Sequence, residues 1–401
     1  MSSAIQHGPI DSAGSRLAAI VLAAGYSSRM GSFKPLLRVG GRTALERSID
    51  LFRAAGVEEV IAVLGHRAEE LRSTAERCGA RCALNQRFER GMYSSIVVGS
   101  RALPRWAKAA FVLPADIPLV RPSTVRKLAQ EWARWQDGIA YPVFDGRRGH
   151  PPLIARKILD FAKEEGAEGP LSVFLASHER DAIEVPVVDE AIHMDMDTRA
   201  DYEALAALAT QREIPTPLEC EAILAGLHVE ESIIAHSRKV AEVATKIAGA
   251  LLRNGVELNA ELVQAGALLH DVAKGQPNHA VVGASILRGM DFDQVADVVA
   301  THTELGSFAD LDETAIVYLA DKLVRGVKVV ALKERFAPAL TRFKKDAEAL
   351  KAARRRMQNA TDVARAVEAR VGADLKSIIN GEFDLNDRDG AEMRGNSVRT
   401  R

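Results

Sequence analysis

The first half of the chain alternates short apolar runs with stretches of helical periodicity. Apolar runs of strand length occupy residues 18–23, 59–64, 109–113 and 139–142. Apolar residues recur at helical spacing between these runs, in residues 43–55, 68–78, 94–102 and 123–135. Because the runs lack polar alternation and helices separate them, they predict a mainly parallel sheet with helices on both faces. We therefore expect an α/β domain over residues 16–208, preceded by a disordered segment, 1–15.

The second half shows helical periodicity and no strand pattern. Residues 209–220 include QREIPTPLE, which carries two prolines and few apolar residues, so this segment is a predicted linker. Helical patterns follow at residues 220–226, 229–254, 259–274, 280–290, 292–302 and 314–325. This order predicts an all-α domain over residues 221–341. Residues 342–401 are then expected to form a charged helical tail, with a solvated helix near 344–371.

Composition excludes several classes of protein. Among 401 residues, 53 Lys and Arg stand against 54 Asp and Glu, which argues against a globally basic nucleic-acid binder. Basic residues 354–356 could contact nucleic acid, but the mixed charge around them is more typical of an exposed helix face. No run approaches about 18 consecutive apolar residues, so we expect no membrane span. Three cysteines and a polar N-terminus without an apolar signal core predict a reduced, cytoplasmic protein.

The first predicted strand runs directly into LAAGYSSRMGSFK, residues 22–34. Gly25 and Gly31, with small residues nearby, allow backbone N–H groups to approach a polyphosphate, and Arg29 and Lys34 would add positive charge there. The segment matches neither GxxxxGK[ST] nor GxGxxG. The pattern therefore predicts a phosphate cradle that is neither a Walker A loop nor a dinucleotide fingerprint.

Two acidic positions suit a metal ion that accompanies a nucleotide. Asp116, in LPADIP, follows a buried strand at the end where ligands sit in open α/β sheets. Asp197, in MDMDT, precedes a helix. Since Mg²⁺ takes carboxylate and phosphate oxygens, we expect Asp116 and Asp197 to bind it together with the triphosphate. Asp197 could instead be the N-cap of the following helix, and Asp195 could be a helix N-terminal acid or a helper.

Residues 17–208 resemble the MobA-like nucleotidyltransferases, especially the molybdenum cofactor cytidylyltransferases, because LAAGxSxRMGxxK is intact. The resemblance implies a Rossmann-like fold. It also implies that the nucleotide is bound by Ala23, Ala24, Gly25, Arg29, Lys34, Asn85 and Ser94. His150, in the GRRGHP segment, would then contact the acceptor, and Asp116 and Asp197 match the two metal-binding aspartates. Relatives that use GTP tend to read LAGG in the loop, so Ala23-Ala24-Gly25 points to CTP.

This resemblance implies a reaction. An acceptor phosphate would attack the α-phosphorus of CTP, and pyrophosphate would leave. Arg29, Lys34 and Asp116, with Mg²⁺, would be the catalytic groups. The implied acceptor is the molybdopterin form of the molybdenum cofactor, and the product would serve a molybdenum hydroxylase, whose apoenzyme is then a potential partner.

Histidines and aspartates recur through the helical half in the order His236, His270, Asp271, His279, His302 and Asp321. They lie too far apart in sequence for a local metal clip, so several helices must bring them together. Most of them end or interrupt an apolar run, where an imidazole or carboxylate is costly unless it is paired or bound to a metal. Imidazole and carboxylate ligands suit one or two ions of Mn, Fe, Co, Ni or Zn, and the pattern does not choose among these metals.

Residues 222–335 resemble the HD superfamily of metal-dependent phosphohydrolases. Its H…HD…D pattern falls on His236, His270-Asp271 and Asp321, with Asp271 as a catalytic group. The resemblance to a two-metal branch, which includes HD-type dinucleoside polyphosphate hydrolases, implies that His279 and His302 are extra ligands. Lys274 could contact substrate phosphate or be a solvated lysine.

The sequence leaves three hypotheses open. The chain could be a bifunctional enzyme that combines CMP transfer with phosphohydrolysis. The helical half could instead be a sensor that binds a nucleotide without hydrolysing it. A third reading is a molybdenum cofactor chaperone for a molybdenum hydroxylase. Intact acids at both sites favour catalysis.

Overall fold

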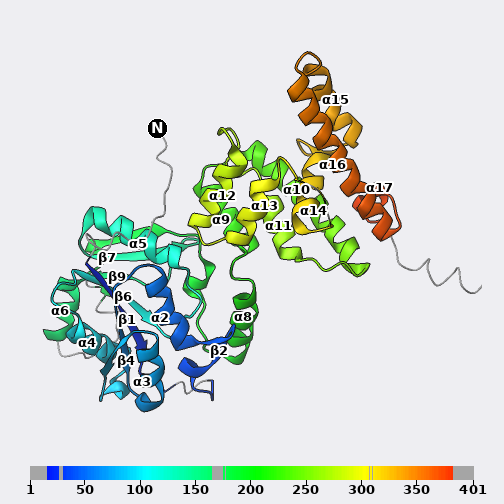
Figure 1. Ribbon diagram of the computed structural model, residues 1–401. Helices are drawn as coiled ribbons and strands as arrows, with labels where there is room; N and C mark the ends of the chain where they lie inside the picture. The colour runs from blue at the N-terminus through cyan, green and yellow to red at the C-terminus, as the bar shows by residue number, and fades with distance from the viewer. Residues whose placement is uncertain are drawn as a thin grey trace, which may run out of the picture. The chain divides into compact units, whose positions relative to one another are not determined.

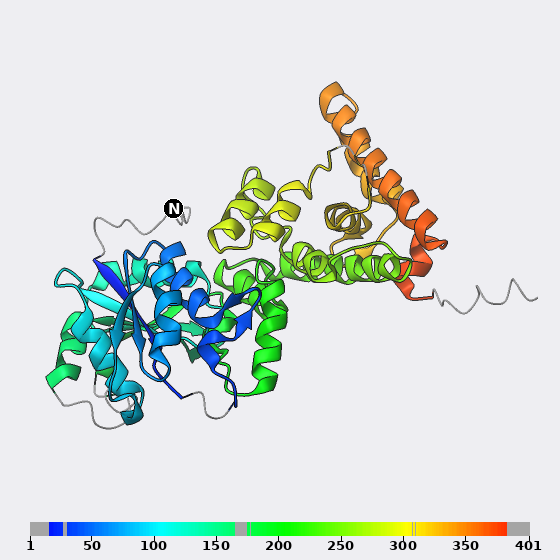
Figure 2. The ribbon, with the colours of Figure 1, turned by 60° about the horizontal axis from the view of Figure 1, so that its bottom comes forward.

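The computed structural model describes residues 16–26, 30–164, 175–176, 178–306, 308 and 310–382. The predicted disordered segment, 1–15, lies outside these residues. Contacts divide the chain into two compact units. Unit 1 extends to Glu213 and includes Gly289–Asp291, and unit 2 contains the rest from Ile214 onward. Figures 1 and 2 show that unit 1 is built on a sheet and unit 2 on helices.

An eight-stranded sheet forms the centre of unit 1, in the order β10-β7-β9-β6-β1-β4-β5 with β8 paired to β7. The strands are β1 (Leu17–Ala23), β4 (Glu59–Leu64), β5 (Arg81–Leu84), β6 (Ala109–Pro114), β7 (Ile139–Phe144), β8 (Arg147–Arg148), β9 (Leu153–Ala155) and β10 (Ala182–Pro186). All pairs are parallel except those of β8 and β9. The prediction of a mainly parallel sheet is confirmed. Its four strongest apolar runs became β1, β4, β6 and β7, whereas the shorter β5, β8, β9 and β10 were missed.

Helices cover both faces of this sheet, as the unbroken apolar runs predicted. They are α2 (Ala44–Ala54), α3 (Ala68–Arg77), α4 (Met92–Ala102), α5 (Pro122–Trp135) and α6 (Arg156–Glu164), while α8 (Arg199–Thr210) packs on the small strand β2 (Arg38–Val39). A short hairpin, β2 and β3 (Arg42–Thr43), leads into α2, whose first turn is closed by a capping box between Thr43 and Glu46.

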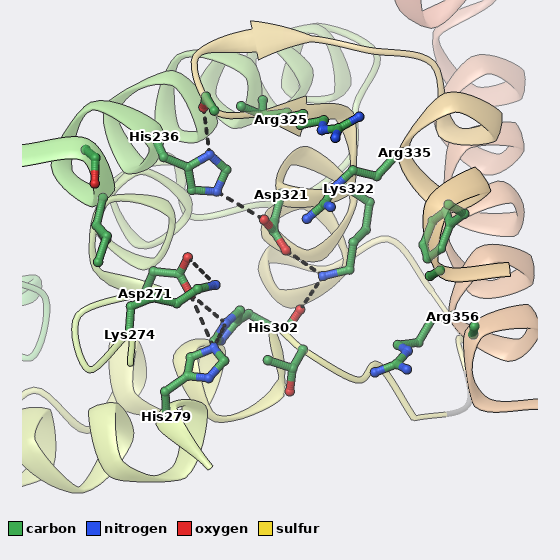
Figure 3. Close-up of a pocket in the computed structure, with 18 residues that line it drawn as sticks. His236, Asp271, Lys274, His279, His302, Asp321, Lys322, Arg325, Arg335 and Arg356 are labelled. Atoms are coloured by element: carbon green, nitrogen blue, oxygen red, sulfur yellow. Dashed lines mark hydrogen bonds and ion pairs between the residues drawn. The ribbon is translucent and has the colours of Figure 1, made fainter. Parts of the chain in front are cut away.

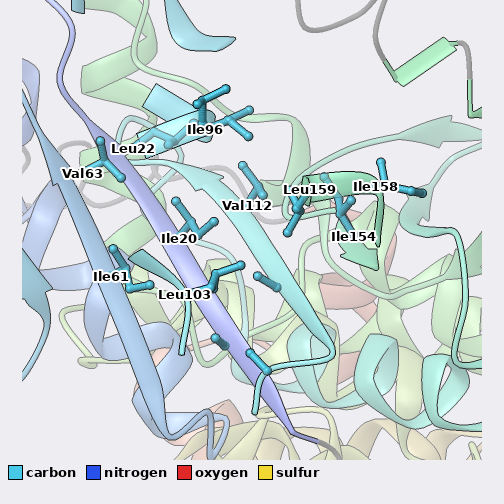
Figure 4. Packing of buried hydrophobic residues seen from close by; sticks show 14 of the residues in the cluster. Ile20, Leu22, Ile61, Val63, Ile96, Leu103, Val112, Ile154, Ile158 and Leu159 are labelled. Carbon is cyan, nitrogen blue, oxygen red and sulfur yellow. The ribbon is translucent and has the colours of Figure 1, made fainter. Parts of the chain in front are cut away.

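Alternate residues of each strand enter different layers of the core. Ile20 and Val112 pack with Ile96 of α4 and Ile158 of α6 (Figure 4). Phe111, the residue before Val112, points to the opposite face, where its ring centroid lies 5.6 Å from that of Phe52 in α2. A strand buried on both faces in this way fixes the register of β1 and β6. That register in turn fixes the loops that follow these two strands.

Unit 2 is helical apart from one small hairpin. Its helices are α9 (Pro217–Gly226), α10 (Glu231–Arg253), α11 (Ala260–Leu269), α12 (His279–Gly289), α13 (Asp293–Thr301), α14 (Glu313–Leu323), α15 (Leu332–Arg342), α16 (Ala347–Val371) and α17 (Leu375–Asn380). The long helix α10 packs on α11, α14, α16 and α17.

Three predicted helices of this unit differ from the observed ones. The helix expected over 259–274 ends at Leu269, with His270 as its C-cap. The helix expected over 314–325 ends at Leu323, because β11 (Val324–Arg325) pairs with β12 (Lys328–Val329) around Gly326, which has a φ of 61°. The helix expected to be solvated near 344–371 buries one face, including Ala353, Ala360 and Val367. The sequence pattern did not reveal this buried face, because charged residues surround it.

Candidate functional site

A cavity of about 340 Å³ lies at the carboxyl ends of β1 and β6 in unit 1. These strands are neighbours in the sheet although β4 follows β1 in the chain, so the cavity lies at a point where the strand order reverses. Its lining includes predicted nucleotide-binding residues, namely Ala23, Ala24, Gly25 and Lys34. Arg29, which was predicted to bind phosphate, lies outside the described residues.

The loop after β1 is held by close backbone contacts. Ala115 N donates to Leu22 O at 2.9 Å, and His66 N donates to Ala24 O at 3.1 Å. Gly65 is required for this approach, because a Cβ there would lie 2.8 Å from the Cβ and carbonyl oxygen of Ala24. The cradle is thus supported from the ends of β4 and β6.

Lys34 bridges the two predicted metal-binding acids. Its Nζ lies 2.7 Å from Asp197 Oδ1 and 3.2 Å from Asp116 Oδ2, and its side chain is 10% exposed. Burial opposes the charge on this lysine, but the hydrogen bond to Asp197 and the charge of Asp116 outweigh it, so the pKa of Lys34 is raised. The two carboxylates therefore face one shared place, beside the cavity.

The loop that carries Asp197 is docked on the end of β6, where Met196 N donates to Asp116 O at 3.1 Å. The N-cap of α8 is Thr198, which forms a capping box with Asp201. The alternative interpretation of Asp197 as that N-cap is therefore wrong. Burial and the charges of Asp197 and Asp116 raise the pKa of Asp195, which places a third acid in the same electrostatic group.

Asn85 and Ser94 lie beneath the cavity and do not line it. Asn85 is 2% exposed, and its amide donates to Ser94 Oγ at 2.9 Å and to Ser95 Oγ at 3.0 Å. Its Oδ1 accepts from Arg87 N. Ser94 Oγ in turn donates to Gly91 O at 2.8 Å. These bonds hold the start of α4, and Ser95, the next residue after Ser94, reaches the cavity lining.

A second cavity of unit 1, of about 470 Å³, adjoins the first and shares Leu22, Met92 and Pro114 with it. His150 lines this second cavity. Within the described part of the chain, its buried Nδ1 has no hydrogen-bond partner. Burial lowers the pKa of His150. The predicted acceptor contact thus lies next to the cavity with the phosphate cradle.

Five of the six predicted ligands of unit 2 line a separate cavity of about 490 Å³ (Figure 3). The sixth, His270, has its ligand atom within 4.8 Å of those of His236 and Asp321. The six ligands form two groups of three: His236, His270 and Asp321, and then Asp271, His279 and His302. Within each group the ligand atoms lie within 4.8 Å of one another. His270 Nε2, which lies 3.4 Å from Asp271 Oδ2, connects the two groups.

Backbone carbonyl groups fix the orientation of three of these imidazoles. The Nδ1 atoms of His236, His270 and His302 lie 2.8, 2.8 and 2.7 Å from carbonyl oxygens of Gly326, Ala267 and Val299, respectively. Each Nε2 is thereby turned toward the carboxylates. Histidine ligands of metals are commonly held in this way, with one nitrogen anchored and the other presented to the ion.

The electrostatics of these groups suit divalent cations. Asp271 and Asp321 have side chains that are 3% and 9% exposed. Burial opposes their charge, but contacts with His270 and Lys322 hold the pKa of Asp271 and of Asp321, respectively, below the usual range. His270 Nε2 is buried without a hydrogen-bond partner among the described residues. A metal ion would satisfy this nitrogen and the carboxylates together.

Basic side chains surround the rest of this cavity. Lys274 Nζ lies 2.9 Å from Asp271 Oδ2, and Lys322 Nζ donates to His302 O at 3.1 Å. Arg325, Arg335 and Arg356 also line it. Sequence reasoning had treated Arg356 as part of an exposed basic run and had not singled out Arg325 or Arg335. Arg356 lies three residues after Ala353, which also lines the cavity, so the two residues share one face of their helix.

Comparison with known proteins finds a family match in each half of the chain. Residues 19–182 match the family of the MobA-like NTP transferase domain, and residues 233–326 match the HD domain. The chain joins a MobA-like NTP transferase domain to an HD domain. Unit 1 therefore contains the MobA-like NTP transferase domain, and unit 2 contains the HD domain.

Individual relatives cover parts of the chain. A bifunctional IPC transferase and DIPP synthase from Rubrobacter xylanophilus is 38% identical over 116 residues, which are 27% of this chain and 26% of that protein. The chain thus spans about a quarter of that relative's length. A solved nucleotidyl transferase from Methanothermobacter thermautotroptrophicus is 22% identical, with a TM-score of 0.42, over 49% of this chain and 98% of that one.

Molybdopterin-guanine dinucleotide biosynthesis protein A from Archaeoglobus fulgidus is 17% identical, with a TM-score of 0.39, and covers 48% of this chain and 99% of its own. None of the helices in the described part of the chain combines the length and the apolar content that crossing a membrane requires.

Proposed function

We propose that the MobA-like domain transfers CMP from CTP to a phosphorylated small molecule, the molybdopterin form of the molybdenum cofactor, and releases pyrophosphate. The observation that carries this proposal is the Lys34 bridge between Asp116 and Asp197 beside the cavity. The Ala23-Ala24-Gly25 sequence supports CTP as the donor. A molybdenum hydroxylase apoenzyme would receive the product.

The residues present fit a bound Mg²⁺, because Asp116 and Asp197 already share one cation, the ammonium group of Lys34. Mg²⁺ held by these two acids would neutralise charge on the triphosphate. In the transfer, an oxygen of the acceptor phosphate forms a bond to the α-phosphorus of CTP, while the bond from that phosphorus to the pyrophosphate oxygen breaks. Lys34 stabilises the negative charge that develops, and the backbone N–H groups of the loop orient the phosphates.

Pyrophosphate release from CTP and from GTP, with and without molybdopterin, tests this reaction. We expect kcat/KM for CTP to exceed that for GTP by about 100-fold, the discrimination that a site built around particular base groups can provide. Faster turnover of GTP would overturn the assignment of CTP. Binding of molybdopterin without pyrophosphate release would favour the chaperone instead.

We also propose that the HD domain is a metal-dependent phosphohydrolase that acts on a nucleotide-like substrate. Its support is the convergence of His236, His270, Asp271, His279, His302 and Asp321. One or two ions of Mn, Fe, Co, Ni or Zn bound there would supply Lewis acidity and a more acidic water. Asp271 and Asp321 provide the negative charge that holds such ions, and the anchored imidazoles keep their donor nitrogens in position.

Phosphate release by the full chain loaded with Mn²⁺ tests the hydrolase. We expect turnover of nucleoside phosphates, and its loss in Asp271→Asn. The exposed Asp310→Asn is the matched control, which should retain turnover because Asp310 lies outside both metal-ligand groups. Nucleotide binding without phosphate release would contradict hydrolysis and support the sensor hypothesis.

A further inference from the structure

The cavity of the HD domain carries more positive charge than its metal ligands require. Five basic residues line it, namely Lys274, Lys322, Arg325, Arg335 and Arg356, against two acids, Asp271 and Asp321. The two lysines are paired with these two acids. No carboxylate lies within ion-pair distance of the three arginines in the described part of the chain. Their charge is therefore available to an anionic ligand.

Two of these arginines come from helices beyond the segment that matches the HD family, residues 233–326. Arg335, Phe336 and Ala339 line the cavity from α15, and Ala353 and Arg356 line it from α16. Residues three and four positions apart share a helix face. We call these five lining residues the arginine wall (Arg335, Phe336, Ala339, Ala353 and Arg356). Figure 3 labels its two arginines.

The arginine wall is fixed to the helix that carries a metal ligand. Tyr318 packs with Phe336 and Ala360, and its hydroxyl donates to Arg356 O at 2.9 Å. Tyr318 lies three residues before Asp321 on α14. The arginine wall and Asp321 are therefore both supported by α14. A binding site requires such a rigid support to hold a bound molecule in a fixed position.

Arg335 carries the second, independent indication of a ligand. Its Nε is buried and has no hydrogen-bond partner among the described residues. A buried guanidinium nitrogen without a partner is costly unless an acceptor reaches it. Guanidinium groups match phosphate geometry, because they can donate two parallel hydrogen bonds.

We propose that Arg335 and Arg356 bind a phosphoryl group of the substrate other than the one at the metal centre. The ligand is thus a small molecule with a chain of two or more phosphates, and the arginine wall selects it over monophosphates. This inference rests on the proposed hydrolase function. Phe336 would lie beside the part of the ligand that follows the phosphates. A nucleoside triphosphate and inorganic tripolyphosphate share the required chemistry.

Kinetics of the full chain loaded with Mn²⁺ tests the selectivity. For Arg335→Gln and Arg356→Gln we expect kcat/KM toward ATP and tripolyphosphate to fall about tenfold or more, mainly through KM, while kcat/KM toward AMP changes less than about twofold. Arg354→Gln removes the same charge from an exposed position on α16 and is the matched control. Equal losses toward AMP and ATP, or no loss in either variant, would overturn the arginine wall. A preference of the wild type for ATP over tripolyphosphate would indicate that the nucleoside is also recognised.

Binding provides a readout that does not depend on hydrolysis. We expect calorimetric titration of tripolyphosphate into EDTA-treated protein to show a site that both wall variants weaken by about tenfold and Arg354→Gln leaves intact. Every protein in this titration also carries Lys34→Gln, so that binding of tripolyphosphate at the transferase cavity is weakened to the same extent in each. If the wild type hydrolyses no phosphate ester but this binding pattern holds, the hydrolase proposal fails and the arginine wall stands. If hydrolysis occurs but the variants bind like the control, the wall fails alone. Thermal melts within a few degrees of wild type show that the variants are folded.

Discussion

The two candidate sites hold their acids in different surroundings. In the transferase domain, Asp116 and Asp197 have side chains that are 27% and 36% exposed, and one lysine lies between them. In the HD domain, Asp271 and Asp321 are 3% and 9% exposed and are surrounded by four imidazoles. Oxygen ligands at an open cavity suit an ion that arrives with a nucleotide, whereas buried mixed ligands suit a resident ion. The proposed functions therefore assign the same residue type to two kinds of metal site.

The largest expected effect lies at the buried site. Asp321→Asn removes one of two negative charges from the HD cavity, so we expect phosphate release to fall by about 10³-fold or more, with pyrophosphate release unchanged. The control is Ser232→Ala, which alters the lining of the same cavity without removing charge. An Asp321→Asn variant with normal phosphate release would remove the distinction between the two sites.

A third environment, that of Asp189, shows that the burial of an aspartate alone does not indicate a metal site. Asp189 is fully buried and accepts hydrogen bonds from Arg121 N and Thr124 Oγ1, both at 2.7 Å, and from Arg212. Protein donors thus satisfy both oxygens of its carboxylate. Asp189→Ala should therefore lower the free energy of unfolding by about 3–5 kcal/mol, since it removes the buried carboxylate that accepts from Arg121 N, Thr124 Oγ1 and Arg212.

Urea denaturation measures this loss. Asp50→Asn breaks an exposed ion pair with Arg42 and should change the free energy of unfolding by less than about 1 kcal/mol. If Asp189→Ala leaves the free energy of unfolding nearly unchanged, this hydrogen-bond network contributes little to stability.

Metal removal should affect the two domains unequally. A resident ion at about 100 times its dissociation constant stabilises the folded state by about 2.7 kcal/mol, so EDTA should lower the melting temperature of the HD domain. Mg²⁺ without CTP should leave the melting of the transferase domain unchanged. Calorimetry of the wild type and of His270→Ala, in which the EDTA effect should disappear, measures both. An EDTA effect that persists in His270→Ala would place the ion elsewhere.

The smallest expected effect concerns the support beneath the nucleotide cavity. Asn85→Ala removes the amide that connects Ser94, Ser95 and Arg87 N, and should destabilise the transferase domain by about 1–3 kcal/mol. If Asn85 acts through this support, KM for CTP and the melting temperature change together. A large rise in KM at an unchanged melting temperature would instead indicate direct contact with the nucleotide.

Apolar patterning predicted the centre of the sheet and most helices, because β1, β4 and β6 are buried on both faces and carry unbroken apolar runs. It missed β5, whose residues RCAL are partly exposed at the sheet edge. It extended the helix before His270 too far, because the apolar periodicity continues through Val272 and Ala273 although the helix ends at Leu269.

Motifs predicted which acids and histidines would meet, and Lys34, Asp116 and Asp197 do lie together, as do the six residues of the HD cavity. They did not predict the hydrogen-bonded position of Asn85 or the arginine wall. Arg335 and Arg356 belong to helices with mixed surface charge, and their place in the cavity depends on how α15 and α16 pack on α14. A local sequence pattern does not determine how helices that are distant in the sequence pack on one another.

Assaying Asp116→Asn and Asp271→Asn side by side in both reactions tests the central claim, that each domain carries out its own chemistry with its own acids. We predict that Asp116→Asn loses pyrophosphate release from CTP and retains phosphate release, and that Asp271→Asn does the reverse. Loss of both activities in either variant, or of neither, would contradict the account.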